Sequence, residues 1–291
     1  MKKQADNINI QYKKQYPNLG LAYNKKYWDC IDSKCKEQEN NRFVEIEKKI
    51  LDWKQSPQYS KDLLELAKKE QSFCLRTTYP GLLIGTGYLH EAPKKENAIK
   101  LGFHFDYTLG VPVIPGSSVK GVLRSYFPDE IGTTNSEEEK KEIASLNEAK
   151  TELICELLGK KLKGVNQIKK LRDYIFEGGA DDEETAQEDV FFDALIVGQK
   201  ENGKGEKSFM GIDYITPHNI PTKNPTPIKM LKIMPDIHIQ FNFDLKDIKI
   251  KRPNNDDIII TGADKINLFK SLLLLGGIGA KTNIGYGQFI E

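Results

Sequence analysis

The segment "IPGSSVKGVLR" carries groups that can bind an anion. A proline–glycine turn precedes a predicted helix through Phe127, in which Lys120 and Arg124 are four residues apart and share one face. We expect Ser117 or Ser118 to cap this helix, whose free amides and dipole favour an anion at its start. Lys, Arg, Ser and helix N-termini are common contacts of phosphodiester backbones. The predicted contact residues are Gly116, Ser117, Ser118, Lys120 and Arg124.

A second such segment is "GGIGAKTNIGYGQF", with five glycines and one lysine. It does not follow the nucleotide-binding patterns. A P-loop needs glycine directly before the lysine and again five residues earlier, where this sequence has Ala280 and Leu275. A dinucleotide fingerprint fails at Thr282, where a third glycine is required. We therefore expect no nucleotide cofactor at this loop.

The glycine-rich loop has features that suit RNA. Glycine lets a backbone approach a ligand or another chain closely, and we assign this role to Gly277 and Gly279. Tyr286 offers a flat face for a base. Donors to a phosphate or a 2′-hydroxyl are supplied by Lys281, Thr282 and Asn283.

Each of the two segments also has a simpler interpretation. The first could be a capped surface helix with two solvated cations, and the second a helix C-cap followed by a bulge. Charge does not decide between them, because the net charge of +1 gives no overall attraction for nucleic acid. Local patches must supply any such attraction.

The surrounding pattern predicts the elements that position both segments. A strand is expected over 71–79, a helix after the Pro115–Gly116 turn, strands in "DVFFDALIVG", "SFMGIDYIT" and "DIHIQFNFDL", a helix in "INLFKSLLLLGG" and a last strand in "IGYGQFI". "IPTKNPTPIKMLKIMP" is interpreted as a proline-rich link. The order strand, helix, strand, strand, helix, strand is the split β-α-β plan of an α+β, ferredoxin-like fold.

Two further regions complete the predicted domain organisation. Residues 1–70 form a helical N-terminal extension, including a helix with Phe43, Ile46, Ile50 and Trp53 at helical spacing and a second helix after Pro57. Residues 71–291 form the ferredoxin-like domain, with a charged helical insertion at about 128–188. No segment has the pattern of a membrane span or a signal peptide, so we expect a cytoplasmic protein with no membrane partner.

Metal and redox sites are not expected. The four cysteines Cys30, Cys35, Cys74 and Cys155 are too few and scattered for a disulfide framework, and no second Cys or His pair accompanies the closest two at zinc spacing. We interpret them as reduced structural thiols.

Acid–base chemistry has a few candidate residues. They are His218, His104, His90 and Asp106. His104 and His238 flank apolar strand-like residues and are interpreted as structural, and no acidic cluster has two-metal spacing. The sequence thus predicts no catalytic residue, with His218 the most open position.

Four segments together resemble one family. "IPGSSVKGVLR" with "GIGAKTNIGYGQF" resembles the two hallmarks of the RAMP superfamily of CRISPR-associated RNA-binding proteins. "VFFDALIV" and "GIDYITPHN" resemble the strand pair of Cmr-type members, and "NLGLAYNKKYW" resembles the entry segment of the sixth Cmr subunit. The resemblance covers most of the chain outside the insertion.

The resemblance implies an RRM-like RAMP fold and a non-catalytic subunit of a type III-B effector ribonucleoprotein. Such a subunit would hold guide RNA, or a guide–target duplex, near the 3′ end of the guide. The implied partners are CRISPR guide RNA, target RNA and other Cmr-type subunits. Two alternatives stay open: a metal-independent endoribonuclease that processes CRISPR RNA, and a purely structural scaffold.

Overall fold

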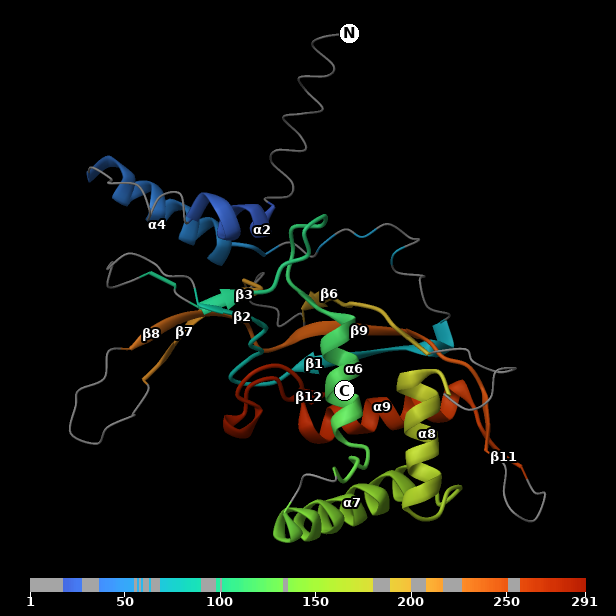
Figure 1. Cartoon of the computed structure of the whole chain (residues 1–291). Coiled ribbons are helices and arrows are strands. Elements are labelled where there is room, and N and C mark those ends of the chain that lie inside the picture. The colour runs from blue at the N-terminus through green and yellow to red at the C-terminus, as the bar shows by residue number, and fades with distance from the viewer. Residues whose placement is uncertain are drawn as a thin grey trace.

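A central antiparallel sheet with helices stacked on one face organises the chain (Figure 1). The computed structural model describes residues 18–27, 37–54, 57, 59, 63, 69–89, 98–99, 101–132, 136–179, 189–199, 208–216, 227–250 and 257–291.

Five strands follow one another across the sheet. Their order is β12 (Phe289–Ile290), β1 (Ser72–Thr77), β9 (Ile237–Asp244), β6 (Ala194–Gln199) and β4 (Val113–Ile114), and β5 (Val190–Phe191) also pairs with β9. Every neighbouring pair is antiparallel. Helix α6 (Gly116–Ser125) precedes β6 in the chain, and α9 (Gly262–Gly276) leads from β9 towards β12. The order β12-β1-β9-β6 is consistent with the ferredoxin-like fold.

The apolar alternation of β9 explains how the sheet is anchored to its helices. Ile239, Phe241 and Phe243 are buried, as the spacing predicts, while the intervening side chains lie on the other face. Phe243 contacts Phe269 of α9 with 5.4 Å between ring centroids. This helix begins at a capping box in which Thr261 and Asp264 bond each other's backbone amides. The predicted helix and strand are confirmed.

Three short hairpins extend from this core (Figure 1). They pair β2 (Gly85–Leu89) with β3 (Leu101–Phe103), β7 (Met210–Ile215) with β8 (Ile228–Ile233), and β10 (Ile248–Ile250) with β11 (Ile258–Ile260). The link predicted over 220–235 is therefore wrong for Ile228–Ile233, which pairs residue by residue with β7. The nearest prolines flank this run without interrupting it.

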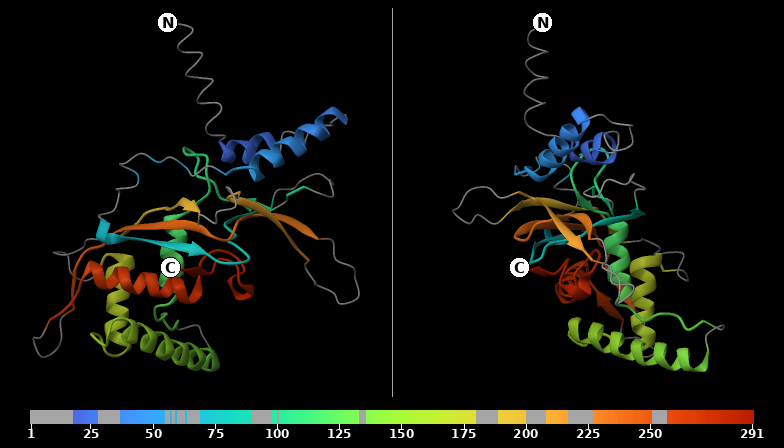
Figure 2. Two further views of the ribbon diagram at one scale, coloured as in Figure 1. Left: turned by 180° about the vertical axis from the view of Figure 1, so that it is seen from behind. Right: turned by 90° about the vertical axis from the view of Figure 1, so that its left-hand side faces the viewer.

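The remaining helices lie outside the sheet. They are α2 (Leu19–Leu21), the π-helix η1 (Ala22–Tyr27), α4 (Glu37–Leu51), the 3-10 turn η2 (Lys69–Gln71), α7 (Glu137–Leu157) and α8 (Val165–Glu177). Helices α7 and α8 come from the predicted insertion and stack on the α6–α9 side of the sheet (Figures 1 and 2). The second helix expected after Pro57 falls mostly outside the described residues. No helix in the described ranges is long and apolar enough to cross a membrane.

Candidate nucleic-acid interface

The basic turn begins α6 without a side-chain cap. Pro115 is the N-cap residue, and its carbonyl accepts hydrogen bonds from the amides of Ser118 and Val119 at 2.8 and 3.1 Å. Ser117 and Ser118 are both exposed. The prediction that one of these serines caps the helix is wrong, because the N-cap is Pro115 and both serines lie inside the first turn of the helix. Their hydroxyls therefore stay at the surface.

The amide at the start of α6 is already occupied by a carboxylate. Gly116 donates its N–H to Asp193 Oδ1 at 2.7 Å, so the chain supplies its own negative charge at this helix start. A Cβ at Gly116 would lie 2.1 Å from the carbonyl oxygen of Phe191. The phosphate contact predicted for Gly116 is thus wrong, and the glycine is needed because β5 packs directly against it. The role of Asp193 was not predicted from the sequence, where the only signal is an acidic residue that interrupts the apolar run "VFFDALIV".

The two cations of α6 have different surroundings. Lys120 Nζ lies 5.9 Å from the ring centroid of Phe191, within cation–π range, and forms no salt bridge to another described residue. Arg124 Nη2 instead lies 2.5 Å from Glu177 Oε1 and joins α6 to α8. Because Glu177 already engages Arg124, Lys120 is the stronger candidate for a phosphate contact.

A polar cleft of about 270 Å³ surrounds Arg124. Arg172 lies at its base, is 5% exposed, and donates to the Pro128 carbonyl and to Glu130. Three carboxylates and two guanidinium groups line the cleft, namely Asp129, Glu130, Glu177, Arg124 and Arg172. Carboxylates outnumber guanidinium groups here, so the cleft does not favour a phosphate, and the Arg124–Glu177 pair joins α6 to α8.

The glycine-rich loop packs against its own chain. Gly277 and Gly279 have φ of +68° and +94°, in the region that favours glycine. A Cβ at Gly279 would lie 2.4 Å from the carbonyl oxygen of Leu83, to which Ala280 also donates at 3.0 Å. Gly287 donates to the Gly81 carbonyl at 2.8 Å. The close approach predicted for Gly277 and Gly279 therefore exists, but the chain's own backbone fills it instead of RNA or a neighbouring chain.

Tyr286 is buried, so its ring is not available to stack on a base. It is 8% exposed, packs with Leu83 and Met230, and donates its hydroxyl to Asp213 Oδ2 at 2.7 Å. Burial, followed by this hydrogen bond, raises the pKa of Tyr286. Burial alone would raise the pKa of Asp213, but hydrogen bonds from Lys232 and Tyr286 bring it below its usual value. The prediction that Tyr286 stacks on a base is wrong.

The three polar residues at the tip of the loop remain accessible. Lys281 is half-buried with φ of +61° and precedes the 3-10 turn η3 (Thr282–Ile284). Lys281 forms no salt bridge to any residue the structure describes. Thr282 is half-buried, and Asn283 is exposed. The RNA contacts predicted for these three residues stay predictions.

The turn and the loop pack against different segments of the chain. The start of α6 packs against β5, whereas the loop packs against the Pro80–Leu83 segment. The C-terminal end of α6 contacts the start of the loop, because a Cβ at Gly276 would lie 1.4 Å from the hydroxyl of Tyr126, the C-cap residue of α6.

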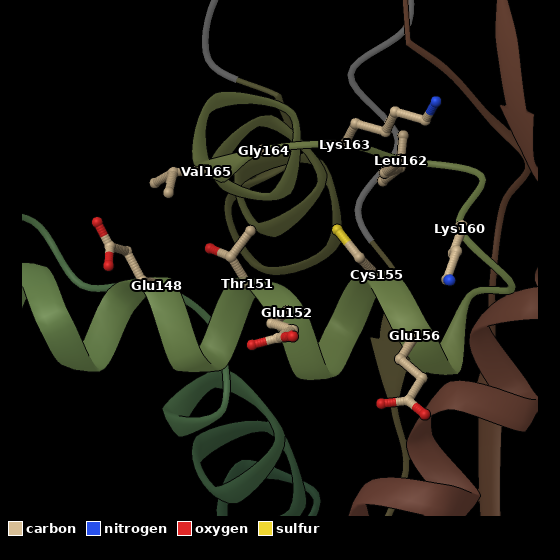
Figure 3. A pocket seen from close by; sticks show the side chains of 10 residues that line it. All are labelled: Glu148, Thr151, Glu152, Cys155, Glu156, Lys160, Leu162, Lys163, Gly164 and Val165. Atoms are coloured by element: carbon tan, nitrogen blue, oxygen red, sulfur yellow. The ribbon is translucent and has the colours of Figure 1, made fainter.

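A groove of mixed charge lies in the insertion. This cavity of about 660 Å³ lies between α7 and the start of α8 (Figure 3). Glu148, Glu152 and Glu156 recur every fourth residue along α7 and line it together with Lys160 and Lys163. None of the three glutamates pairs with a cation among the described residues. Because both signs of charge line the groove, it is not a dedicated phosphate site.

No catalytic constellation is apparent in the described part of the chain. His104 and His238 are half-buried, and Asp106 Oδ1 accepts the amide of Leu109 at 2.5 Å within a turn. No group of three or more His, Cys, Asp or Glu residues there could hold a metal. Cys74 and Cys155 are free thiols. His90, His218, Cys30 and Cys35 lie outside the described residues.

Comparison with known proteins gives the family. No curated protein matches the chain. A chain of the cryo-EM structure of the Type III-B Cmr-beta bound to cognate target RNA is similar, with 20% identity, a TM-score of 0.48, and coverage of 96% of this chain and 92% of that one. The crystal structure of Cmr6 from Pyrococcus furiosus is similar at 22% identity and a TM-score of 0.40, covering 76% of this chain and 96% of that one. The family model of the RAMP superfamily matches residues 74–290, and the chain therefore belongs to the RAMP superfamily.

Proposed function

We propose that the chain is a non-catalytic, RNA-binding subunit of a type III-B CRISPR effector ribonucleoprotein in antiviral defence. Membership of the RAMP superfamily over residues 74–290 supports this, together with the two hallmark segments. The observation that carries the RNA-binding part is the accessible tip of the glycine-rich loop, where Lys281 has no salt bridge to another described residue and Asn283 is exposed. The partners are guide RNA, target RNA and other Cmr-type subunits.

The contact set is smaller than the sequence predicts. It comprises Ser117, Ser118 and Lys120 on the basic turn, and Lys281, Thr282 and Asn283 on the loop. Because the turn packs against β5 and the loop against the Pro80–Leu83 segment, we propose that they contact different points of one strand or duplex. A position near the 3′ end of the guide rests on the resemblance of "NLGLAYNKKYW" to the entry segment of the sixth Cmr subunit.

The salt dependence of RNA affinity tests this proposal. Lys281→Ala and Lys120→Ala are each expected to weaken binding of single-stranded RNA several-fold and to flatten the slope of log affinity against log salt by about 0.7, the value for one lost phosphate contact on a single strand. Lys140→Ala on α7 is the matched control, since this lysine pairs with Glu137 on the insertion. Unchanged affinity and slope in both folded variants would favour a scaffold that docks only protein subunits.

The second expectation is that the isolated chain has no RNA-cleaving or ATP-hydrolysing activity. The purified chain should leave RNA and ATP intact with or without magnesium, because the loop departs from the P-loop pattern and no acid–base pair is recognisable in the sequence. In an assembled complex, His218→Ala should leave all activity unchanged. Specific RNA cleavage by the isolated wild-type chain, abolished in His218→Ala, would establish the endoribonuclease alternative instead.

A further inference from the structure

Tyr79 has a rigid backbone and an exposed ring. Tyr79 is 84% exposed, although it lies only two residues after the end of strand β1. On one side Thr78 donates its amide to the Gln288 carbonyl at 3.0 Å, and on the other Gly81 donates to the Thr78 carbonyl at 2.8 Å. The turn therefore orders the backbone that carries the ring, while the ring itself is open to solvent. An ordered backbone reduces the conformational entropy that is lost on binding.

The Tyr79 turn lies beside the tip of the glycine-rich loop. A Cβ at Gly285 would lie 3.6 Å from Pro80 Cδ, and Gly287 bonds the Gly81 carbonyl. Figures 1 and 2 show the segment after β1 running alongside the red C-terminal loop in both views. The loop in turn folds back on itself, because the amides of Ile284 and Tyr286 both donate to the Lys281 carbonyl. The exposed ring of Tyr79 thus lies on the segment that packs against the loop carrying Lys281 and Asn283.

We propose that Tyr79 is a stacking platform for one base of single-stranded RNA, with Lys281 and Asn283 contacting the adjacent phosphate and ribose. The inference rests on the proposed RNA-binding function and adds the residue that engages a base. Bases stack on aromatic rings irrespective of sequence, and lysine beside such a ring is the usual combination in single-strand binding surfaces. Tyr79 thereby takes the role that the sequence assigns to Tyr286, whose ring is buried.

A protein partner is the competing occupant of this surface. Ile284 is 60% exposed on the same loop and could join Tyr79 in an apolar contact with another subunit. The two occupants differ in what they require of residue 79. A stacked base needs a flat ring, whereas an apolar contact accepts a branched aliphatic side chain of similar size.

The test measures binding of the full-length chain to a short labelled oligoriboadenylate by fluorescence anisotropy. Tyr79→Ala is expected to weaken binding roughly 5- to 100-fold. Tyr79→Leu should behave like Tyr79→Ala, and Tyr79→Phe should stay within about twofold of the wild type because it keeps the ring. The salt slope should not change, since no phosphate contact is lost. Tyr107→Ala is the matched control, because this ring is 98% exposed on the Asp106–Leu109 turn.

The possible failures are distinguishable. If the wild type binds the oligonucleotide with a clear salt dependence and Tyr79→Ala binds equally well, the stacking inference is wrong and the proposed function stands. If Tyr79→Leu retains full RNA affinity, or if Tyr79→Ala loses only partner subunits, the surface is a protein contact. If the wild type does not bind RNA, both the inference and the proposed function fail. Unchanged thermal melting of the Tyr79 variants confirms that they fold.

Discussion

Lys265→Met lowers the free energy of unfolding by about 3–5 kcal/mol, the largest effect we expect from a single substitution. Lys265 Nζ lies 2.5 Å from Asp189 Oδ2, and the two side chains are 0% and 1% exposed. Burial raises the pKa of Asp189 and lowers the pKa of Lys265, since the interior disfavours both charges. Methionine fills the space but leaves the Asp189 carboxylate buried without its cation. Chemical denaturation monitored by circular dichroism measures the loss.

Two comparisons isolate the effect of the buried charge. The double variant Asp189→Asn with Lys265→Met should recover most of the lost stability, because the amide oxygen can still accept the Lys246 amide bonded to Asp189 in the wild type. Lys161→Met is the exposed control: it breaks an ion pair with Asp264 in which Lys161 is 44% exposed, and should cost less than about 1 kcal/mol. A Lys265→Met variant as stable as Lys161→Met would contradict the prediction.

The same ion pair bears on the candidate interface. Asp189 directly precedes β5, whose Phe191 lies under Lys120, and Asp193 holds the start of α6 two residues further along. Through its ion pair with Asp189, Lys265 of α9 therefore anchors the segment from Asp189 to Asp193, against which the basic turn packs. We expect folded Lys265→Met protein to retain less RNA than the wild type for this reason.

Gly279→Val is the second large expected change. It places a branched side chain at φ of +94° and a Cβ 2.4 Å from the Leu83 carbonyl oxygen, displacing the hydrogen bond from Ala280. The backbone strain and the lost hydrogen bond should together lower the free energy of unfolding by roughly 2–4 kcal/mol. Thermal melting measures the loss, and co-purification of RNA and partner subunits measures its consequence for function.

Matched variants separate the backbone of the loop from its side chains. Gly121→Ala on α6 should be neutral or stabilising by up to about 1 kcal/mol, because its Cβ would meet no described atom within 4 Å. Lys281→Ala should melt like the wild type and lose RNA only partly. The expected order of RNA retention is wild type, then Lys281→Ala, then Gly279→Val. Wild-type melting of Gly279→Val would mean that the loop can move away from Leu83 at little cost.

Elements with a clear hydrophobic period and a glycine at their end were predictable from the sequence. The alternation in β9 predicts a half-buried strand, and the apolar run of α9 predicts the helix that packs on it. Gly277 follows the end of α9, where a glycine is expected. Hairpins β2–β3 and β10–β11 were not predicted, because strands of three to five residues carry too few positions for a period to be visible.

The site was only partly predictable, because residues distant in sequence determine whether each side chain is exposed and which group it pairs with. Arg124 looks like a free cation until Glu177, 53 residues away, is placed beside it. Tyr286 looks like an exposed ring until Asp213 accepts its hydroxyl. The local turn η3 leaves Asn283 exposed and Lys281 half-buried, and their predicted RNA contacts stay predictions.

Photo-crosslinking of 4-thiouridine-labelled RNA in the assembled ribonucleoprotein, read out by mass spectrometry, tests most directly whether this chain holds RNA at the two proposed surfaces. We predict cross-linked peptides from the Tyr79–Leu83 turn and the Gly277–Gln288 loop, with further cross-links in the Gly116–Arg124 segment. Cross-links confined to α7 and α8, or absent from this chain while other subunits are labelled, would contradict the proposed RNA interface.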